Sequence, residues 1–319
     1  MTLFTCTLAI SACSLLADKP IAVAAHVWLG YAPMFLARDE GWLNTKQVRL
    51  VETPTATTSI QALVDGKVDG AALTLDEALK VRSMGLPISV VMVFDVSAGA
   101  DMLLADTSIK NLSDLRGKRI GYEPSSVGEV MLVKILQMAH LTKKEVKLVA
   151  IKVDQHQQAW RNKQIDAIIT YEPIATLLLT QGAHKLFDTR QVPNLVVDVL
   201  VMRNDVLNRS HALAVRHLIS AHFRALRHLS HNPHDAAYRM ATHLGLGVQQ
   251  VLGAYKGLQL PDAANSYRLL AADKPLLLNS AHSLATLMFD HQLITQPDDL
   301  SSLIRAEYLP RDFNVANDE

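Results

Sequence analysis

A ten-residue pattern occurs twice in this sequence, at residues 61–70 and 158–167. Each copy begins with Gln-Ala at the predicted end of a helix and leads through a short turn into a short apolar strand. Because copies spaced by roughly 100 residues are too far apart for a solenoid unit, the repeat predicts two similar α/β lobes. Its aspartates, Asp69 and Asp166, are expected to bond turn backbone rather than ligand. Polar residues after the two strands are expected to face one cleft, where open α/β sheets bind ligands.

A second motif precedes the first copy of the repeat. It comprises the segment from Val27 to Ala37 and the segment from Glu40 to Leu43. Together with the repeat, this motif resembles the nitrate/sulfonate/taurine type of periplasmic solute-binding protein, a component of ABC importers whose domain is shared with thiamine-pyrimidine synthesis proteins. The resemblance covers roughly residues 19–230. It implies an α/β, type 2 periplasmic binding fold with a ligand cleft between two lobes and a helical C-terminal region.

The order of predicted elements divides the chain into three units. These are a leader and tether (1–18), lobe one (19–105 with 199–319) and lobe two (106–198). Chain crossings near Ala105 and Asp198 would make a two-strand hinge, and closure of such a hinge around a ligand is the expected motion. From Ser210 to Tyr308 the pattern is helical.

Composition and the N-terminus restrict the class of protein. Charge is balanced, with 31 Lys and Arg against 31 Asp and Glu, which argues against a nucleic-acid partner. Both cysteines, Cys6 and Cys13, lie near the start, so the remaining sequence predicts no disulfide. The apolar residues before Cys13 are typical of a bacterial lipobox, although no Lys or Arg precedes Lys19. We therefore expect a periplasmic lipoprotein anchored to the membrane through Cys13, or else a hydrophobic N-terminus with an incidental cysteine.

Candidate ligand-binding residues come from predicted strand ends and helix starts. From lobe one they are Trp28, Tyr31, Thr57, Thr58, Thr74, Asp76, Glu77 and the segment from Asp95 to Asp101. From lobe two they are Glu123, Ser125, Ser126, Tyr171 and Glu172, with Asp198 near the hinge. Aromatic walls with a few placed polar groups are typical of small-molecule pockets.

Several of these candidates have a structural alternative. Trp28 and Tyr31 could be core aromatics. Ser126 with Glu129 matches a capping box, in which the serine ends its own helix. Glu172 could be an acid at a helix start, favoured by the helix dipole.

The candidate loops contain acidic side chains and no Lys or Arg. The acids are Asp76, Glu77, Asp95, Asp101, Glu123 and Glu172. A site for a sulfonate or a carboxylate usually includes a guanidinium or an ammonium group. The composition therefore favours a ligand with donor groups, such as an amine, a zwitterion or an aminopyrimidine, although helix N-termini alone can bind anions.

Seven histidines between His211 and His243 invite a metal interpretation. His228, His231 and His234 would be neighbours on one helix. However, Pro233 lies among them and predicts a helix boundary. Apart from Asp235, no cysteine or pair of acids lies nearby to complete a set of metal ligands. Motifs for a catalytic nucleophile, a phosphate loop or a dinucleotide turn are absent from the sequence. The sequence predicts no metal site, no cofactor and no enzymatic activity.

The resemblance implies an extracytoplasmic, monomeric solute-binding protein that captures a small organic molecule and delivers it to an ABC permease. One alternative is a ligand-sensing subunit for a membrane signalling protein. A second is a pyrimidine-synthesis enzyme like the fungal relatives. The resemblance implies a cysteine-rich segment for such an enzyme. This sequence has no cysteine after Cys13, which argues against the enzymatic alternative.

Overall fold

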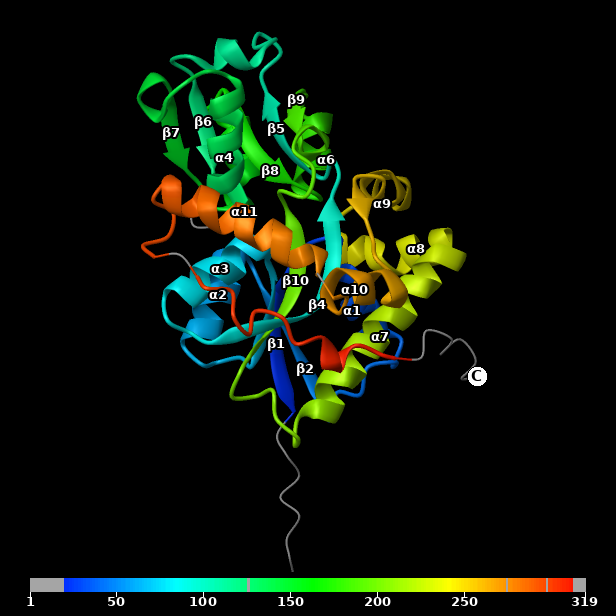
Figure 1. Ribbon diagram of the computed structural model, residues 1–319. Helices are drawn as coiled ribbons and strands as arrows, with labels where there is room; N and C mark the ends of the chain where they lie inside the picture. The colour runs from blue at the N-terminus through cyan, green and yellow to red at the C-terminus, as the bar shows by residue number, and fades with distance from the viewer. Residues whose placement is uncertain (1–19, 125–126, 274, 297, 312–319) are drawn as a thin grey trace, which may run out of the picture.

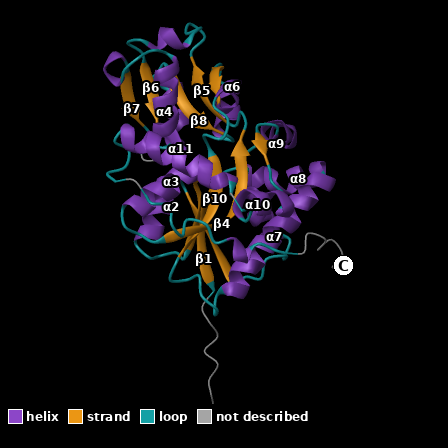
Figure 2. Ribbon diagram, in the orientation of Figure 1, coloured by secondary structure: helices purple, strands orange, loops and turns teal. Residues whose placement is uncertain are grey.

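The computed structural model describes residues 20–311 except 125–126, 274 and 297. Its strands form two sheets, and each sheet is the centre of one lobe with helices around it (Figure 1, Figure 2). None of the helices in this part of the chain combines the length and the apolar character of a membrane span. The predicted leader with Cys13, and both Ser125 and Ser126, lie outside the described residues.

Lobe one contains a six-stranded sheet in the order β11-β4-β10-β3-β1-β2. The strands are β1 (Ile21–His26), β2 (Val48–Thr53), β3 (Gly70–Thr74), β4 (Ile88–Ser97), β10 (Val197–Arg203) and β11 (Leu258–Gln259). The helices are α1 (Ala32–Asp39), α2 (Ala56–Val64), α3 (Leu75–Ser83), α7 (Ala212–His231), α8 (Pro233–Leu244), α9 (Val248–Tyr255), α10 (Ala263–Leu270) and α11 (Leu276–Asp290). Strands β1 and β3 are buried along their whole length, as expected for strands in a sheet covered on both faces.

Lobe two contains a five-stranded sheet in the order β7-β6-β8-β5-β9. The strands are β5 (Asp101–Ala105), β6 (Arg119–Tyr122), β7 (Lys147–Ala150), β8 (Ala167–Tyr171) and β9 (His184–Asp188). The helices are α4 (Val127–Met138), α5 (His156–Arg161) and α6 (Ile174–Thr180). A helix between successive parallel strands is the usual right-handed crossover connection.

Strand pairing shows that the two lobes share one arrangement, as the repeat predicts. Strand β1 pairs in parallel with β2 and β3, and β6 pairs in parallel with β7 and β8. On their other side, β3 and β8 pair with the antiparallel strands β10 and β5. Strands β3 and β8 follow directly from the two repeat copies, and their carboxyl ends therefore occupy equivalent places in the two lobes.

Asp69 and Asp166 have the same structural role in the two lobes. Asp69 Oδ2 accepts a hydrogen bond from the backbone N–H of Ala22 in β1, at 2.7 Å. Asp166 Oδ2 accepts one from the backbone N–H of Arg119 in β6, at 2.8 Å. The prediction that these carboxylates bond the backbone of the turn is therefore wrong. Each carboxylate instead bonds the backbone at the start of a neighbouring strand, and so fixes the register of β1 or β6.

The chain crosses between the sheets at two places. The first crossing lies between Ser97 and Asp101 and the second between Asp188 and Val197. Strand β5 therefore belongs to the second sheet, whereas the sequence-based boundary placed residues up to 105 in lobe one. The crossings are joined by hydrogen bonds, since Thr189 Oγ1 lies 2.7 Å from Ser97 Oγ and accepts the backbone N–H of Gly99 at 2.7 Å.

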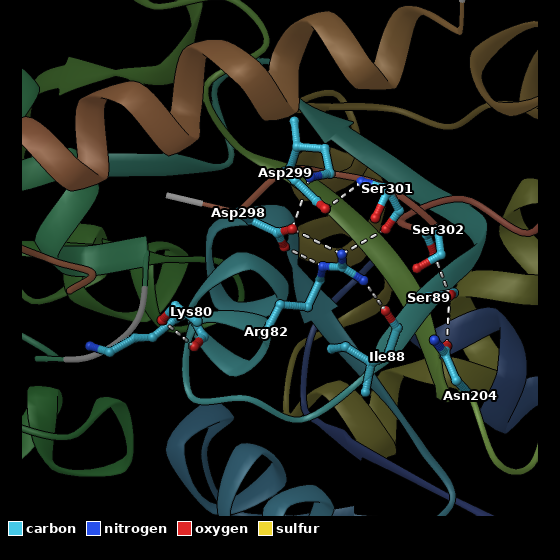
Figure 3. Close-up of polar contacts among 11 residues, drawn as sticks. Lys80, Arg82, Ile88, Ser89, Asn204, Asp298, Asp299, Ser301 and Ser302 are labelled. Carbon is cyan, nitrogen blue, oxygen red and sulfur yellow. Dashed lines mark hydrogen bonds and ion pairs between the residues drawn. The ribbon is translucent and has the colours of Figure 1, made fainter. Parts of the chain in front are cut away.

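A buried ion pair fastens the C-terminal segment to lobe one (Figure 3). Both Nε and Nη2 of Arg82 donate to the carboxylate of Asp298, and these side chains are only 10% and 7% exposed. Arg82 Nη2 also donates to the carbonyl of Ser301 at 2.8 Å. Nearby, the backbone N–H of Val90 donates to the carbonyl of Leu303 at 2.7 Å. The segment thus runs along β4 and bonds its backbone.

Replacement of Arg82 by Met is expected to lower the free energy of unfolding by about 3–5 kcal/mol, because Asp298 would remain buried without its partner. Urea denaturation measures this loss. The double variant Arg82→Met/Asp298→Leu should recover most of it. Arg305→Met, which removes a more exposed pair with Glu307, should cost less than about 1 kcal/mol. Equal losses in Arg82→Met and Arg305→Met would contradict the role given to the buried pair.

Candidate functional site

Two small adjoining cavities lie where the carboxyl ends of strands from both lobes meet. The first is lined by His26, Trp28, Ala56, Thr74, Glu77 and Asp198 from lobe one, and by Asp101, Val127 and Tyr171 from lobe two. The second is lined by Asp101, Glu123, Val127, Gly128, Met131, His156, Ile169, Thr170 and Tyr171. Each holds about 10 Å³, which is room for about one water molecule. The lobes are therefore closed upon this site.

Asp198 and Asp101 occupy matching positions in the two lobes. Asp198 in β10 pairs with Thr74, the last residue of β3. Asp101 in β5 pairs with Tyr171, the last residue of β8. Both side chains line the first cavity. The fold therefore brings one carboxylate from each lobe to the same small space.

The loop between β1 and α1 is held by bonds from aromatic side chains to buried carboxylates. Trp28 Nε1 donates to Asp95 Oδ2 at 3.0 Å, and the hydroxyl of Tyr31 donates to Asp198 Oδ1. Gly30 leaves room for the first bond, because a Cβ at this position would lie 1.7 Å from Asp95 Oδ2. The loop thereby fixes the Trp28 ring at the cavity and orients Asp198.

Aromatic rings from both lobes meet at the cavity. The ring centroids of Trp28 and Tyr171 lie 5.6 Å apart at an interplanar angle of 85°. His26 contacts Tyr171 at 5.9 Å in a similar edge-on manner. Edge-to-face contacts of this kind favour association beyond the area that they bury. They form part of the interface that closes the two lobes.

The carboxyl groups around the cavities are deeply buried, and several oxygens have no hydrogen-bond partner among the described residues. Burial raises the pKa of Asp95 and that of Asp101 to about 7, and the pKa of Asp76 to about 6. Burial, followed by the charges of Asp95 and Asp101, raises the pKa of Asp198 well above its usual range. The oxygens without a partner are Oδ1 of Asp76, Oδ1 of Asp95, Oδ2 of Asp101 and Oδ2 of Asp198. No Lys or Arg is among the residues that line the two cavities.

Two polar contacts join the lobes beside the cavities. Thr57 Oγ1 in α2 donates to Glu123 Oε1 at 2.8 Å. Lys80 Nζ in α3 pairs with Glu129 Oε2 in α4 at 3.2 Å, and both side chains are 24% exposed. These contacts can form only while the lobes are closed.

Of the sequence-predicted candidates, those that line the cavities are Trp28, Thr74, Glu77, Asp101, Glu123, Tyr171 and Asp198. Tyr31 is fully buried behind them and acts through Asp198. Asp76 is buried but is not among the lining residues. Thr57 contributes its bond to Glu123 instead.

Thr58 and Glu172 are engaged at helix starts. The hydroxyl of Thr58 lies 3.0 Å from that of Thr55, the residue that caps α2. Both oxygens of Glu172 accept bonds from Thr176, one from its backbone N–H and one from its hydroxyl, at 3.0 Å each. The alternative interpretation of Glu172 as a helix-start acid therefore matches the geometry.

The sequence interpretation did not include His26 and His156 among the candidates. His26 is the last residue of β1, so its place at a strand end was a usable signal. His156 begins α5, and its ring nitrogens lie 3.1 Å from Thr170 Oγ1 and 3.2 Å from the carbonyl of Ile151. Burial lowers the pKa of both histidines to about 4, so both rings are neutral at neutral pH.

The histidines of α7 and α8 are not arranged as a metal site. His228 Nε2 bonds Asp235 Oδ2 at 2.7 Å, and Asp235 also pairs with Arg239. Helix α8 begins at Pro233, which separates His234 from the histidines of α7 as the sequence predicts. Within the described ranges, no group of three or more His, Cys, Asp or Glu side chains is placed to hold a metal ion.

A larger groove of about 440 Å³ lies apart from the interlobe cavities. Its walls are Lys134 of α4, the segment 192–195 and one face of α11. None of the sequence-predicted candidates lines it. The groove is wide, but it lacks the convergent buried polar groups that mark the interlobe site.

Replacement of Gly30 by Ala is expected to displace Asp95 from Trp28, because the new methyl group would occupy the space of the Asp95 carboxylate. We expect a loss of about 1–3 kcal/mol in unfolding free energy, typical of overpacking, and a shift in Trp fluorescence. Gly253→Ala is the matched control, since a Cβ there meets no atom within 4 Å. Unchanged Trp fluorescence in Gly30→Ala would contradict the role of Gly30.

Stability is expected to fall as the pH rises from 6.5 to about 8. Above pH 6.5 the buried histidines are neutral in both the folded and the unfolded state, so they contribute little there. The carboxyls with pKa near 7 still hold protons in the folded state that the unfolded state has lost, and stability therefore decreases with pH. Urea midpoints at the two pH values measure the effect. Asp101→Asn should show a smaller decrease, and a midpoint that rises with pH would refute this account.

Comparisons with known proteins agree with the family that the sequence motifs resemble. The family model "NMT1/THI5 like" matches residues 28–236. No curated protein matches the sequence. The fold is similar to that of the alkanesulfonate-binding protein SsuA from Xanthomonas axonopodis pv. citri bound to MOPS, with a TM-score of 0.76, 16% identity, and coverage of 91% of this chain and 100% of that chain.

Two other solved structures have a similar fold. The periplasmic nitrate-binding protein NrtA from Synechocystis PCC 6803 has a TM-score of 0.64 and 12% identity, with 92% of each chain covered. The desulfurization enzyme DSZB has a TM-score of 0.67 and 16% identity, with 90% of this chain and 97% of that chain covered. At these identities the likeness shows the fold alone, that of a two-lobed periplasmic binding protein. The family match, in contrast, spans more than half of the sequence, and the chain belongs to the NMT1/THI5-like family.

Proposed function

We propose that the protein is an extracytoplasmic solute-binding protein that encloses a small organic molecule between its lobes and delivers it to an ABC importer. The observation that carries this proposal is the closed interlobe site, where Asp198 and Trp28 of lobe one face Asp101 and Tyr171 of lobe two. A ligand in this position contacts both lobes. The bound ligand therefore favours the closed form over the open form, and closure distinguishes the loaded binding protein from the empty one.

The interlobe contacts suit a binding cycle better than catalysis. Thr170 and His156 form a hydroxyl–imidazole pair at the second cavity. Burial lowers the pKa of His156 to about 4, which makes its ring a weak base at neutral pH. The site thus offers shape and charge to a ligand but a poor means of activating a nucleophile.

We also propose that Cys13 carries a lipid that anchors the protein to the membrane. The small and apolar residues before Cys13 support this proposal. Expression of the full chain in a bacterial host, with labelling by a radioactive fatty acid, tests it. Label should enter the wild type and be lost in Cys13→Ala, whereas label in both would refute the anchor.

A thermal-shift screen of residues 19–319 tests the binding function. The panel comprises sulfonates, taurine, nitrate, polyamines, amino acids, betaines and thiamine pyrimidines. A solute at one hundred times its dissociation constant adds about 2.7 kcal/mol of stability. X-ray scattering on the hits should show lobe closure. A panel without hits, with unchanged scattering, would count against a solute-binding role.

Lys80→Met is expected to weaken binding of any hit roughly two- to fivefold, because the variant loses a partly exposed ion pair made only in the closed form. The dissociation constant from calorimetry measures the effect. Lys67→Met is the matched control, since Lys67 pairs with Asp65 within lobe one and should leave affinity unchanged. The same loss in both variants would mean that the Lys80–Glu129 pair does not favour closure.

A further inference from the structure

We infer that the ligand of the interlobe site is a small organic cation, and that its positive charge is what permits the lobes to close at neutral pH. The inference rests on the proposed function and names the chemical class of the solute. It departs from the sulfonate and nitrate that appear in the names of the structural relatives. Four observations support it.

The first observation is the convergence of unpartnered acceptors on one small space. Asp101 and Asp198 line the first cavity, are only 3% and 2% exposed, and each has an Oδ2 atom without a hydrogen-bond partner among the described residues. The hydroxyl of Tyr171 at the same cavity also lacks a partner there. Buried polar atoms are normally bonded, so the two carboxyl oxygens indicate a molecule that supplies donors, while the Tyr171 hydroxyl can donate to it or accept from it.

The second observation is that the donors to these carboxylates are neutral. The indole of Trp28 donates to Asp95 and the phenol of Tyr31 donates to Asp198. Lys80, an ammonium group near the acids at the start of α3, is paired with Glu129. Neutral donors bond a carboxylate but do not cancel its charge. A buried carboxylate needs either a partner of opposite sign or a proton, and the residues that line the cavities include no Lys or Arg as such a partner.

The third observation is that one of the like charges comes from the other lobe. Burial, then the charge of Asp95 and then the charge of Asp101 raise the pKa of Asp198, and of these charges that of Asp101 acts on Asp198 from lobe two. Closing the cleft brings these two carboxylates together and removes them from water, so repulsion between them opposes closure. A cation bound between them reverses the sign of this interaction. Closure of the loaded protein is then favoured and closure of the empty protein is not.

The fourth observation concerns size and shape. In the closed form the cavity has room for about one water molecule, which is also the size of an ammonium group. Trp28 and Tyr171 line the same space, and aromatic rings attract cations. We therefore assign the site to a ligand whose ammonium or amidinium group sits between Asp101 and Asp198. A sulfonate or nitrate would instead add negative charge to the cluster.

The test uses matched probes of opposite charge at pH 8 and constant ionic strength. Methylammonium, guanidinium and benzylammonium are compared with nitrate, methanesulfonate and benzenesulfonate in thermal-shift assays on residues 19–319. The wild type should be stabilised by the cations and not by the anions.

Asp101→Asn and Asp198→Asn should lower affinity for the best cation at least about tenfold, as expected when a buried charge pair loses one member. Asp205→Asn, at an exposed acid, is the control and should bind as the wild type does.

A second measurement decides the case without reliance on any one probe. In the absence of ligand at pH 8, Asp101→Asn and Asp198→Asn should melt several degrees above the wild type, because each removes a carboxyl whose raised pKa means that folding must either bind a proton or bury a charge there. Stabilisation of the wild type by an anion, or variants no more stable than the wild type, would overturn the cation assignment. Either result leaves the proposed function standing if scattering still shows ligand-driven closure. Failure of every solute to close the lobes would instead remove the proposed function itself.

Discussion

The structure depends on the removal of several carboxylates from water without a cation beside them. A buried carboxylate is costly unless it is bonded and its charge is balanced, yet Asp95, Asp101 and Asp198 receive bonds only in part. A fold tolerates such a cluster when the rest of the molecule is stable enough to offset it. The fully buried strands of both sheets and the fastened C-terminal segment supply that stability. In the function proposed above, this acidic cluster binds the solute, and the stability of the scaffold offsets its cost.

The repeat explains how one carboxylate arrives from each side. Each lobe uses the same order of strands, and in each an antiparallel neighbour places an aspartate opposite the last residue of the repeat strand. Asp69 and Asp166 fix the register at the other end of these sheets. A shift of one residue would turn the side chains to the opposite face. The register of β10 against β3 and of β5 against β8 is thus what makes Asp101 and Asp198 meet.

Much of the fold could be predicted from the sequence, because it depends on local patterns. The repeat predicted two lobes, and strand ends predicted Trp28, Thr74, Tyr171 and Asp198 as residues near one cleft. Whether a candidate faces the cavity or its own helix could not be predicted, since that is decided by side-chain bonds such as those of Glu172 with Thr176. Strand β11 was also missed, because two residues are too few to show a period. The boundary at residue 105 was misplaced for a related reason. The sequence of an apolar strand such as β5 does not indicate which of the two sheets the strand joins.

The hydroxyl contact between Ser97 and Thr189 has a consequence for how the molecule can move. This contact joins the two crossing segments side by side, so neither segment can slide past the other without breaking the contact. Two linkers fixed together behave as one pivot, which allows bending about a single axis and resists twisting. The lobes should then return to the same alignment in each cycle. A site that relies on the meeting of Asp101 and Asp198 needs that reproducibility, because a twist of the lobes would separate the two acids even in a closed cleft.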